Sequence, residues 1–357
     1  MATKEERKME YVNLGRSGLK VSRLSYGNFT NGDDEEEAQR RANALVKLAW
    51  DNGINFFDTA QSYDHGKAEK QMGLALKALG VPRSDYVIST KIFRGTLLET
   101  VNKANNTGCF RKKLHEGVNR SLKSLDLDYV DVLFCHRYDE GTPTIETVQA
   151  IKDLIANGKV LYWATSTWPA VKLMEAIHIC DAIGCPRPIA EQCQYNMLFR
   201  EEIESNYTDF FDDYGLGTTI WSPLCSGILT GKYNEGIPEG SRLAKNPHFK
   251  AHIFDPYLGT EEKKKETVGK LNALAEIAKR LGCSQPQLAL AWTLKTDDVT
   301  TCILGASKAS QLEENLAALD VVDKLTPEVL KEIEEILDNR PVRRTDYRTW
   351  QPLPHRR

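Results

Sequence analysis

Short apolar runs alternate with amphipathic segments along most of the chain. The amphipathic segments repeat apolar residues at helical spacing, and several end at a glycine, which is typical of helices that pack one face on a core. The apolar runs are continuous, as expected for strands buried on both faces. We predict strands at 24–28, 56–60, 86–92, 129–136, 161–166, 189–195, 217–224 and 301–305, and helices at 35–52, 67–79, 111–125, 144–156 and 170–183.

This order of elements predicts an α/β fold, a closed (β/α)₈ TIM barrel. An open, doubly wound sheet is the alternative. No G-x-G-x-x-G follows the first apolar run, so the main sequence support for a dinucleotide-binding domain of that second type is missing.

Three further segments flank or interrupt the predicted barrel, and we expect residues 1–357 to form one domain. Residues 11–21 read as an N-terminal β-hairpin, and 327–337 as an extra C-terminal helix before a basic, proline-containing tail. Residues 225–261 are rich in glycine, proline and asparagine, and we expect a long, loosely packed loop after the seventh strand that covers the cofactor.

Composition excludes several classes of protein. Of the 357 residues, 41% are hydrophobic and 27% charged, which is ordinary for a soluble globular protein. The net charge of −3 argues against a nucleic-acid binder. No apolar run is long enough to span a membrane, and the charged N-terminus does not resemble a signal peptide. The cysteines form no C-x-x-C pair, so we expect reduced thiols, no metal site and a cytoplasmic location.

Candidate catalytic residues lie at the ends of successive predicted strands. Asp58 ends the second strand, Tyr63 follows it, Lys91 lies near the end of the third, and His136 ends the fourth. In a (β/α)₈ barrel these ends meet at one rim, where functional groups collect. Because ionised side chains are rarely buried without a partner, we expect Asp58 and Lys91, which lie in apolar strands, to form a pair.

A tyrosine beside a lysine suits proton donation. Free tyrosine has a pKa of about 10, and a nearby ammonium lowers it. Tyr63 could then protonate a developing alkoxide, with Asp58 orienting Lys91 and His136 hydrogen-bonding the same oxygen. This arrangement suits reduction of a carbonyl group. Each residue taken singly has an ordinary structural role, and a purely structural polar cluster is the alternative.

Several motifs are similar to those of a known family. The stretch from Asp58 to Gly73, D-T-A-Q-S-Y-D-H-G-K-A-E-K-Q-M-G, resembles the aldo-keto reductase signature. Other stretches that resemble this family are 89–91, 125–136, 221–224 and 305–307. The chain also resembles one branch of this family, the β-subunits of voltage-gated potassium channels and their relatives. The stretches that carry this resemblance are 52–58, 162–166, 231–233, 278–282 and 346–348.

The resemblance implies that NADPH, or NADP⁺, binds in an extended conformation across the C-terminal mouth of the barrel. It places Ser166 and Gln192 at the nicotinamide carboxamide, Trp221 against the nicotinamide ring, and Gly27 and Asn28 near its ribose. It assigns further groups to the rest of the cofactor: Asp58 and Gly305 in the binding stretches, Ser222, Leu224, Lys232 and Arg242 at the pyrophosphate, Ser307, Lys308 and Gln311 at the 2′-phosphate, and Glu314 and Asn315 at the adenine.

Two functions follow from the resemblance. One is an NADPH-dependent oxidoreductase that reduces a small aldehyde or ketone with Tyr63 as general acid. The other is a nucleotide-sensing regulatory subunit that docks on a channel. Channel subunits typically have asparagine at the position of His136, so the histidine favours the reductase. The resemblance also implies a homo-oligomer, a tetramer.

Overall fold

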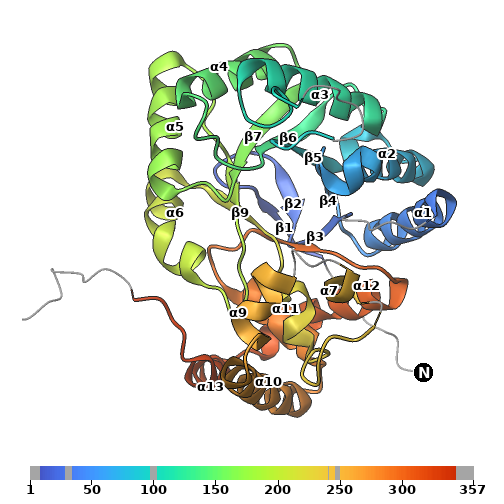
Figure 1. The fold of residues 1–357 in the computed structure, drawn as a ribbon, viewed down its shortest axis with the longest axis vertical. Helices are drawn as coiled ribbons and strands as arrows, with labels where there is room; N and C mark the ends of the chain where they lie inside the picture. Colours follow the sequence, from blue (N-terminus) through green and yellow to red (C-terminus); the bar gives the residue numbers. More distant parts are fainter. Residues whose placement is uncertain (1–8, 29–33, 97–102, 240, 246–249, 343–357) are drawn as a thin grey trace, which may run out of the picture.

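The computed structural model describes residues 9–28, 34–96, 103–239, 241–245 and 250–342. Eight parallel strands lie at its centre: β3 (Leu24–Gly27), β4 (Phe56–Asp58), β5 (Val87–Ile92), β6 (Val130–Cys135), β7 (Val160–Ser166), β8 (Ala190–Gln192), β9 (Gly217–Ile220) and β10 (Thr301–Leu304). They close in the order β10-β3-β4-β5-β6-β7-β8-β9, which confirms the predicted barrel and excludes the open sheet (Figure 1).

Helices follow the strands on the outside of the barrel (Figure 1). Asp34 caps the first of them by accepting hydrogen bonds from the amides of Glu36 and Glu37, which stabilises its N-terminus. Gly80 and Gly184 end two others in the left-handed conformation. The helices that follow β3 to β8 are α1 (Glu35–Asp51), α2 (Lys67–Leu79), α3 (Arg111–Leu125), α4 (Thr144–Ala156), α5 (Ala170–Ile183) and α6 (Thr208–Tyr214).

Alternate strand residues pack in two separate cores. Phe57 belongs to the large core shared with the helices, whereas Phe56 belongs to a smaller core inside the barrel. Leu14 and Val21 of the N-terminal hairpin, β1 (Tyr11–Asn13) and β2 (Lys20–Ser22), join that inner core. The hairpin therefore closes the end of the barrel where the strands begin, and the strand C-termini face the other end.

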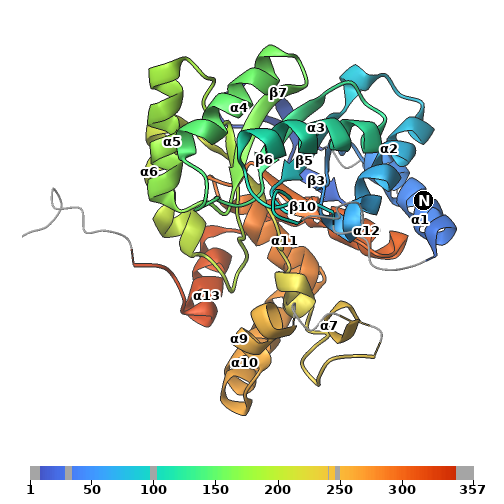
Figure 2. The ribbon, with the colours of Figure 1, turned by 45° about the horizontal axis from the view of Figure 1, so that its top comes forward.

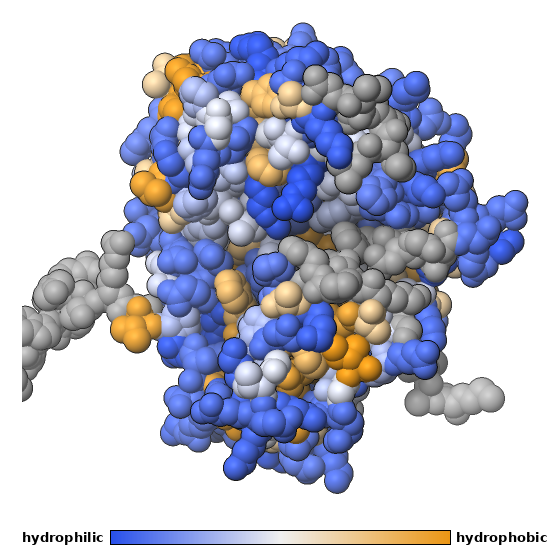
Figure 3. All heavy atoms as spheres, viewed as in Figure 1, coloured by the Kyte–Doolittle hydropathy of each residue, from blue (hydrophilic) through white to orange (hydrophobic). Residues whose placement is uncertain are grey.

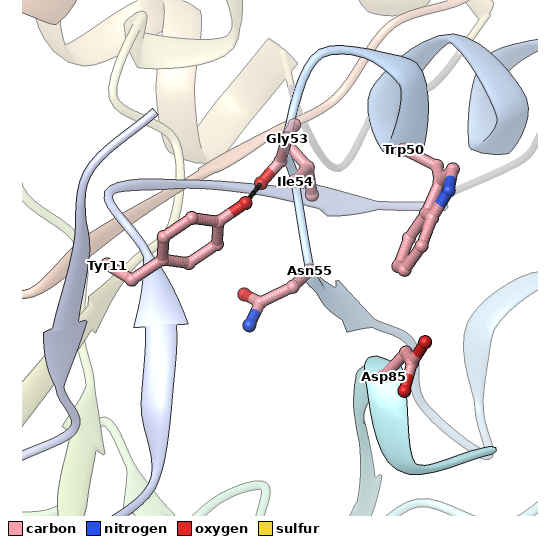
Figure 4. Close-up of a pocket in the computed structure, with 6 residues that line it drawn as sticks. All are labelled: Tyr11, Trp50, Gly53, Ile54, Asn55 and Asp85. Atoms are coloured by element: carbon pink, nitrogen blue, oxygen red, sulfur yellow. Dashed lines mark hydrogen bonds between the residues drawn. The ribbon is translucent and has the colours of Figure 1, made fainter. Parts of the chain in front are cut away.

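A small pocket lies beside the hairpin at the closed end of the barrel (Figure 4). Tyr11, Trp50, Asn55 and Asp85 line it, and the Tyr11 hydroxyl donates to the carbonyl of Gly53 at 2.8 Å. Asn55 directly precedes β4, whereas Asp58 ends that strand. The pocket is thus at the opposite end from the predicted catalytic residues.

The segment 225–261 differs from the expected loose loop. It contains short helical turns, and Leu229, Leu243, Phe254 and Leu258 are buried in the large core. These anchors lie far apart in sequence, so the apolar pattern gave little sign of them. Figure 2 shows part of this segment beside α10 (Glu261–Leu281), below the barrel. The helical turns are η4 (Cys225–Thr230), α7 (Arg242–Lys245), η5 (Lys250–Phe254) and α9 (Asp255–Leu258).

The C-terminal part contains the predicted helix α13 (Pro327–Leu337), which Thr326 caps, and two unpredicted helices before β10. α10 (Glu261–Leu281) opens with charged residues, and α11 (Gln285–Lys295) is buried nearly all round, so neither begins with an obvious amphipathic stripe. The predicted tail beyond 342 lies outside the described residues. Among the described helices, none has the length and apolar character needed to cross a membrane.

Candidate active site

The four predicted catalytic side chains lie together at the C-terminal rim of the barrel. Lys91 Nζ donates to Asp58 Oδ2 in a short ion pair and to the carbonyl of Thr59 at 2.8 Å. Both charged side chains are buried. Lys91 Nζ lies 4.9 Å from the centroid of the Tyr63 ring, and the Tyr63 and His136 rings meet edge to face at 5.7 Å. Their roles stay a prediction, but their proximity is a feature of the fold.

Strand register explains the placement of the ion pair. Asp58 is opposite Ser89 in the β4–β5 ladder, and Lys91 lies two residues further on the same face of β5. Ser89 Oγ donates to Asp58 Oδ1 at 2.6 Å, and Gln192 Nε2 approaches the same oxygen at 3.3 Å. Donors from β5 and β8 therefore fix the Asp58 carboxylate, which in turn fixes Lys91.

A tight turn, η1 (Tyr63–Gly66), carries the tyrosine. Asp64, His65 and Gly66 have positive φ angles of 45°, 55° and 95°, and the chain then enters α2. Aspartate, histidine and glycine are the residue types that tolerate this left-handed region best. The local sequence thus favours a reversal that leaves Tyr63 at the rim above Lys91.

His136 is half-buried at the end of β6, and its surroundings keep it uncharged. Burial lowers the pKa of His136 well below its usual value, and the charges of Lys91, Arg137 and Arg94 lower it further. A neutral imidazole can donate a hydrogen bond but is a poor source of a proton near neutral pH. These surroundings therefore suit His136 as a hydrogen-bond donor rather than as an acid.

Predicted nicotinamide-binding residues surround these four. Gly27 approaches Asp58 so closely that a Cβ at position 27 would lie 3.8 Å from Asp58 Oδ2 and 2.8 Å from Ile303 Cγ2. The Asn28 amide donates to the Asp58 carbonyl at 3.2 Å, and Ser166 Oγ donates to the Gln192 carbonyl at 3.0 Å. The rim from β3 to β8 thus brings together five of the predicted cofactor residues, Gly27, Asn28, Asp58, Ser166 and Gln192.

Two buried polar atoms at this rim favour a bound polar ligand. In the described part of the chain, Asn28 Oδ1 and Trp221 Nε1 are buried and have no hydrogen-bond partner. An unsatisfied buried polar atom costs free energy, so a ligand that supplies partners fits such a site. The Trp221 side chain is half-buried directly after β9. These observations fit a nicotinamide nucleotide.

The residues predicted at the pyrophosphate follow β9. Ser222 has a φ of 56°, and its Oγ accepts from the Ser226 amide at 2.9 Å. The exposed Lys232 lies over Gly227, where a Cβ would be 2.7 Å from Lys232 Nζ, so the glycine makes room for the lysine. Leu224 is half-buried, and Arg242 begins α7, although its side chain lies outside the described part.

The residues predicted at the 2′-phosphate and adenine follow β10. Ser307 donates through its amide and hydroxyl to Gln311 Oε1 at 2.9 and 3.0 Å, and Lys308 is the N-cap of α12 (Ala309–Leu316). Further along α12, Glu314 is exposed and Asn315 buried, and Gly305 borders open space. This group is therefore positioned by β10 and α12, whereas Asp58 and Lys91 are positioned by β4 and β5.

Two contributors escaped prediction. Ser89 donates a hydrogen bond to Asp58. Its position two residues before Lys91, on the same face of the strand, could have indicated this contact. Glu191 is fully buried in β8, where its carboxylate accepts from Thr165 Oγ1 at 2.5 Å and from the amide of Thr167. Thr167 has a φ of 53°, which is unusual for a β-branched residue. An ionisable residue within an apolar strand, the criterion that found Asp58, also applied to Glu191.

We expect Glu191→Gln to alter the pH dependence of stability. Burial, its largest influence, raises the pKa of Glu191 from 4.5 to about 8 in the folded protein. Between pH 4.5 and about pH 8, Glu191 is ionised in the unfolded chain but still protonated in the folded protein. The group therefore destabilises the folded protein increasingly as pH rises, and the effect reaches its full size above the folded pKa. From about pH 5 to about pH 9 the variant should gain about 4 kcal/mol of stability relative to wild type.

Urea unfolding at both pH values measures this difference. Glu262→Gln, an exposed change on α10, is the control and should show no such gain. A stability difference between Glu191→Gln and wild type that does not change with pH would contradict the assignment.

Comparison with known proteins agrees with the fold. The model of the Aldo/keto reductase family matches residues 23–338. The chain belongs to this family. A Schizosaccharomyces pombe protein named as a voltage-gated potassium channel subunit beta is 48% identical over 330 residues, covering 92% of this chain and 93% of the relative.

Two plant proteins carry the same subunit name. The Oryza sativa subsp. japonica relative is 44% identical and the Arabidopsis thaliana relative 43%, each over 344 residues, 95% of this chain and 100% of the relative. Membership of the family supports oxidoreductase activity in general, whereas the names of these relatives refer to a channel. The resemblance drawn from the motifs is therefore confirmed, both to the family and to the branch that contains the channel β-subunits.

Proposed function

We propose that this protein reduces aldehydes or ketones to alcohols with NADPH, and that Tyr63 is the general acid. The observation that carries the proposal is that the Tyr63 ring contacts two groups: the buried Lys91 ammonium, 4.9 Å from the ring centroid, and the His136 ring, 5.7 Å away between centroids. A cation beside a phenol favours loss of the phenolic proton.

Each side chain has one task in this proposal. Bound NADPH would supply the hydride. Ser166, Gln192 and Trp221 orient the nicotinamide, and the substrate oxygen lies between Tyr63 and His136. As negative charge develops on that oxygen, the Tyr63 hydroxyl transfers its proton to it, while neutral His136 donates a hydrogen bond. Lys91, held by Asp58, stabilises the phenolate that Tyr63 becomes.

A nucleotide-sensing channel subunit is the second candidate, because the relatives carry that name. Steady-state NADPH oxidation with a panel of small aldehydes separates the two. We expect continued consumption with several members of the panel. Tight NADPH binding without turnover on any of them would favour the sensor.

The eight cysteines are free thiols, which suits the reducing cytoplasm that we propose as the location.

We expect a preference for NADPH over NADH of more than about 100-fold in kcat/KM. Ser307 and Lys308 lie at the start of α12, where a helix N-terminus favours an anion. Two charge-assisted hydrogen bonds of about 1.5–3 kcal/mol each would give this ratio. Lys308→Met should lose about tenfold or more with NADPH and nothing with NADH.

The matched control is Lys331→Met, which removes an exposed lysine on α13. Equal kcat/KM for the two cofactors in the wild type would contradict the assignment of this group to the 2′-phosphate.

A further inference from the structure

A buried lysine lies behind the turn that carries Tyr63. Lys113, in the first turn of α3, is only 4% exposed, and its Nζ donates to Gln61 Oε1 at 2.8 Å. Gln61 is itself 1% exposed and lies between Asp58 and Tyr63 in the sequence. An ammonium buried against a neutral amide is costly, whereas most buried lysines have an anionic partner. Simple packing therefore gives no reason for a lysine here.

Gln61 connects three elements of the site. Its side chain accepts from Lys113 on α3, and its amide donates to the carbonyl of Lys91 on β5 at 3.2 Å. Two residues later, the Tyr63 amide donates to the Ala60 carbonyl at 3.1 Å and closes the turn. The position of Gln61 thus decides how the turn sits above Lys91. The Lys113 ammonium is the charged group that holds the Gln61 side chain.

The titratable groups around Lys113 come from α2, from α3 and from Cys109, two residues before α3. Burial first and the charge of Arg120 second lower the pKa of Lys113 to about 8, although Cys109, Glu116 and Glu69 act in the opposite direction. Glu69 of α2 is buried and accepts from Thr90 Oγ1 at 2.5 Å.

Burial raises the pKa of Glu69 to about 7, against the charges of Lys91 and Lys113, which lower it. Glu69 is therefore partly ionised at the pH where Lys113 begins to lose its proton. Neither group neutralises the other fully, so the charge on Lys113 changes just above neutral pH.

We propose that Lys113 is a positioning residue: its ammonium fixes Gln61 and thereby holds Tyr63 in place against Lys91 and His136. A neutral amine donates a weaker hydrogen bond than an ammonium. The turn therefore loosens when Lys113 loses its proton. The consequence for catalysis rests on the proposed function, whereas the consequence for the turn does not.

The kinetic test compares pH profiles of kcat with one saturating aldehyde. Wild-type kcat should fall as pH rises through about 8. Lys113→Met should reduce kcat about tenfold at neutral pH, since small displacements of a reacting group have effects of this size, and should abolish that fall. Gln61→Glu gives the ammonium an anionic partner, so the fall should move to higher pH.

Lys112→Met is the control for this series, because Lys112 is an exposed neighbour on α3 that pairs with Glu116. It should leave kcat and its pH profile unchanged. NADPH affinity should be unchanged in all three variants. Lys113→Met with the kcat and pH profile of the wild type would overturn the proposal.

A second readout does not need turnover. Hydrogen-exchange protection of the amides in residues 59–66 should decrease in the wild type as pH rises through about 8, and should be low at every pH in Lys113→Met. Protection that is equal in the two proteins overturns the role of Lys113. A wild type that reduces no carbonyl contradicts the proposed function instead, and the exchange result then decides the positioning role alone.

Discussion

Tyr63→Phe should lower kcat by about 10²–10⁴-fold and leave NADPH affinity nearly unchanged. The substitution removes the hydroxyl that donates the proton and keeps the ring. The ring contacts with Lys91 and His136, at 4.9 and 5.7 Å, should therefore persist. Steady-state kinetics with an aldehyde and fluorescence titration with NADPH measure the two quantities separately.

The matched control is Tyr11→Phe. Its hydroxyl donates to the Gly53 carbonyl at the closed end of the barrel, away from the site (Figure 4). This variant should keep wild-type kcat. A Tyr63→Phe protein with kcat close to that of the wild type would show that another group supplies the proton.

Asp58→Asn should destabilise the protein by about 3–5 kcal/mol, because it leaves the buried Lys91 ammonium without a counter-charge. Activity should be lost as well. The double variant Asp58→Asn with Lys91→Met removes both charges and should recover most of the stability while remaining inactive. Urea unfolding measures the free energies, and the comparison separates the burial of a charge from the loss of a contact.

The exposed pair Lys47 and Asp51 on α1 provides the reference for this experiment. Asp51→Asn should cost less than about 1 kcal/mol. If Asp58→Asn costs no more than Asp51→Asn, or if the double variant is no more stable than the single one, the pair does not hold the site together as described.

The face of the molecule drawn in Figure 3 is largely hydrophilic, as expected where amphipathic helices turn their polar sides outward. Continuous apolar strands between amphipathic helices allow few folds, so the barrel followed from the sequence. An ionised residue in an apolar strand needs a partner, so the Asp58–Lys91 pair also followed. Lys113 lies in the polar run R-K-K-L-H-E-G, which reads as an exposed helix face. Its burial depends on where α3 crosses the Tyr63 turn, and only tertiary structure decides that.

The distant part of the predicted cofactor site shows the same limit. Sequence motifs selected Ser307, Lys308 and Gln311 because of the resemblance, not because any spacing related them to Tyr63. The structure pairs Ser307 with Gln311 at the start of α12. Segment 225–261 was expected to be loose, yet Leu229 and Leu258 anchor it in the core. Isolated apolar residues in a loop do not indicate which of them will find a buried position.

Transfer of deuterium from NADPH that carries deuterium at both positions of nicotinamide C4 tests the central claim most directly. Wild-type protein is incubated with the labelled cofactor and an aldehyde that supports turnover, and the alcohol is analysed by mass spectrometry and proton NMR. We predict one deuterium on the carbinol carbon for each NADPH oxidised, and formation at least about 100-fold slower with Tyr63→Phe. Alcohol without deuterium, or bound NADPH that is never oxidised by any aldehyde, would contradict the account.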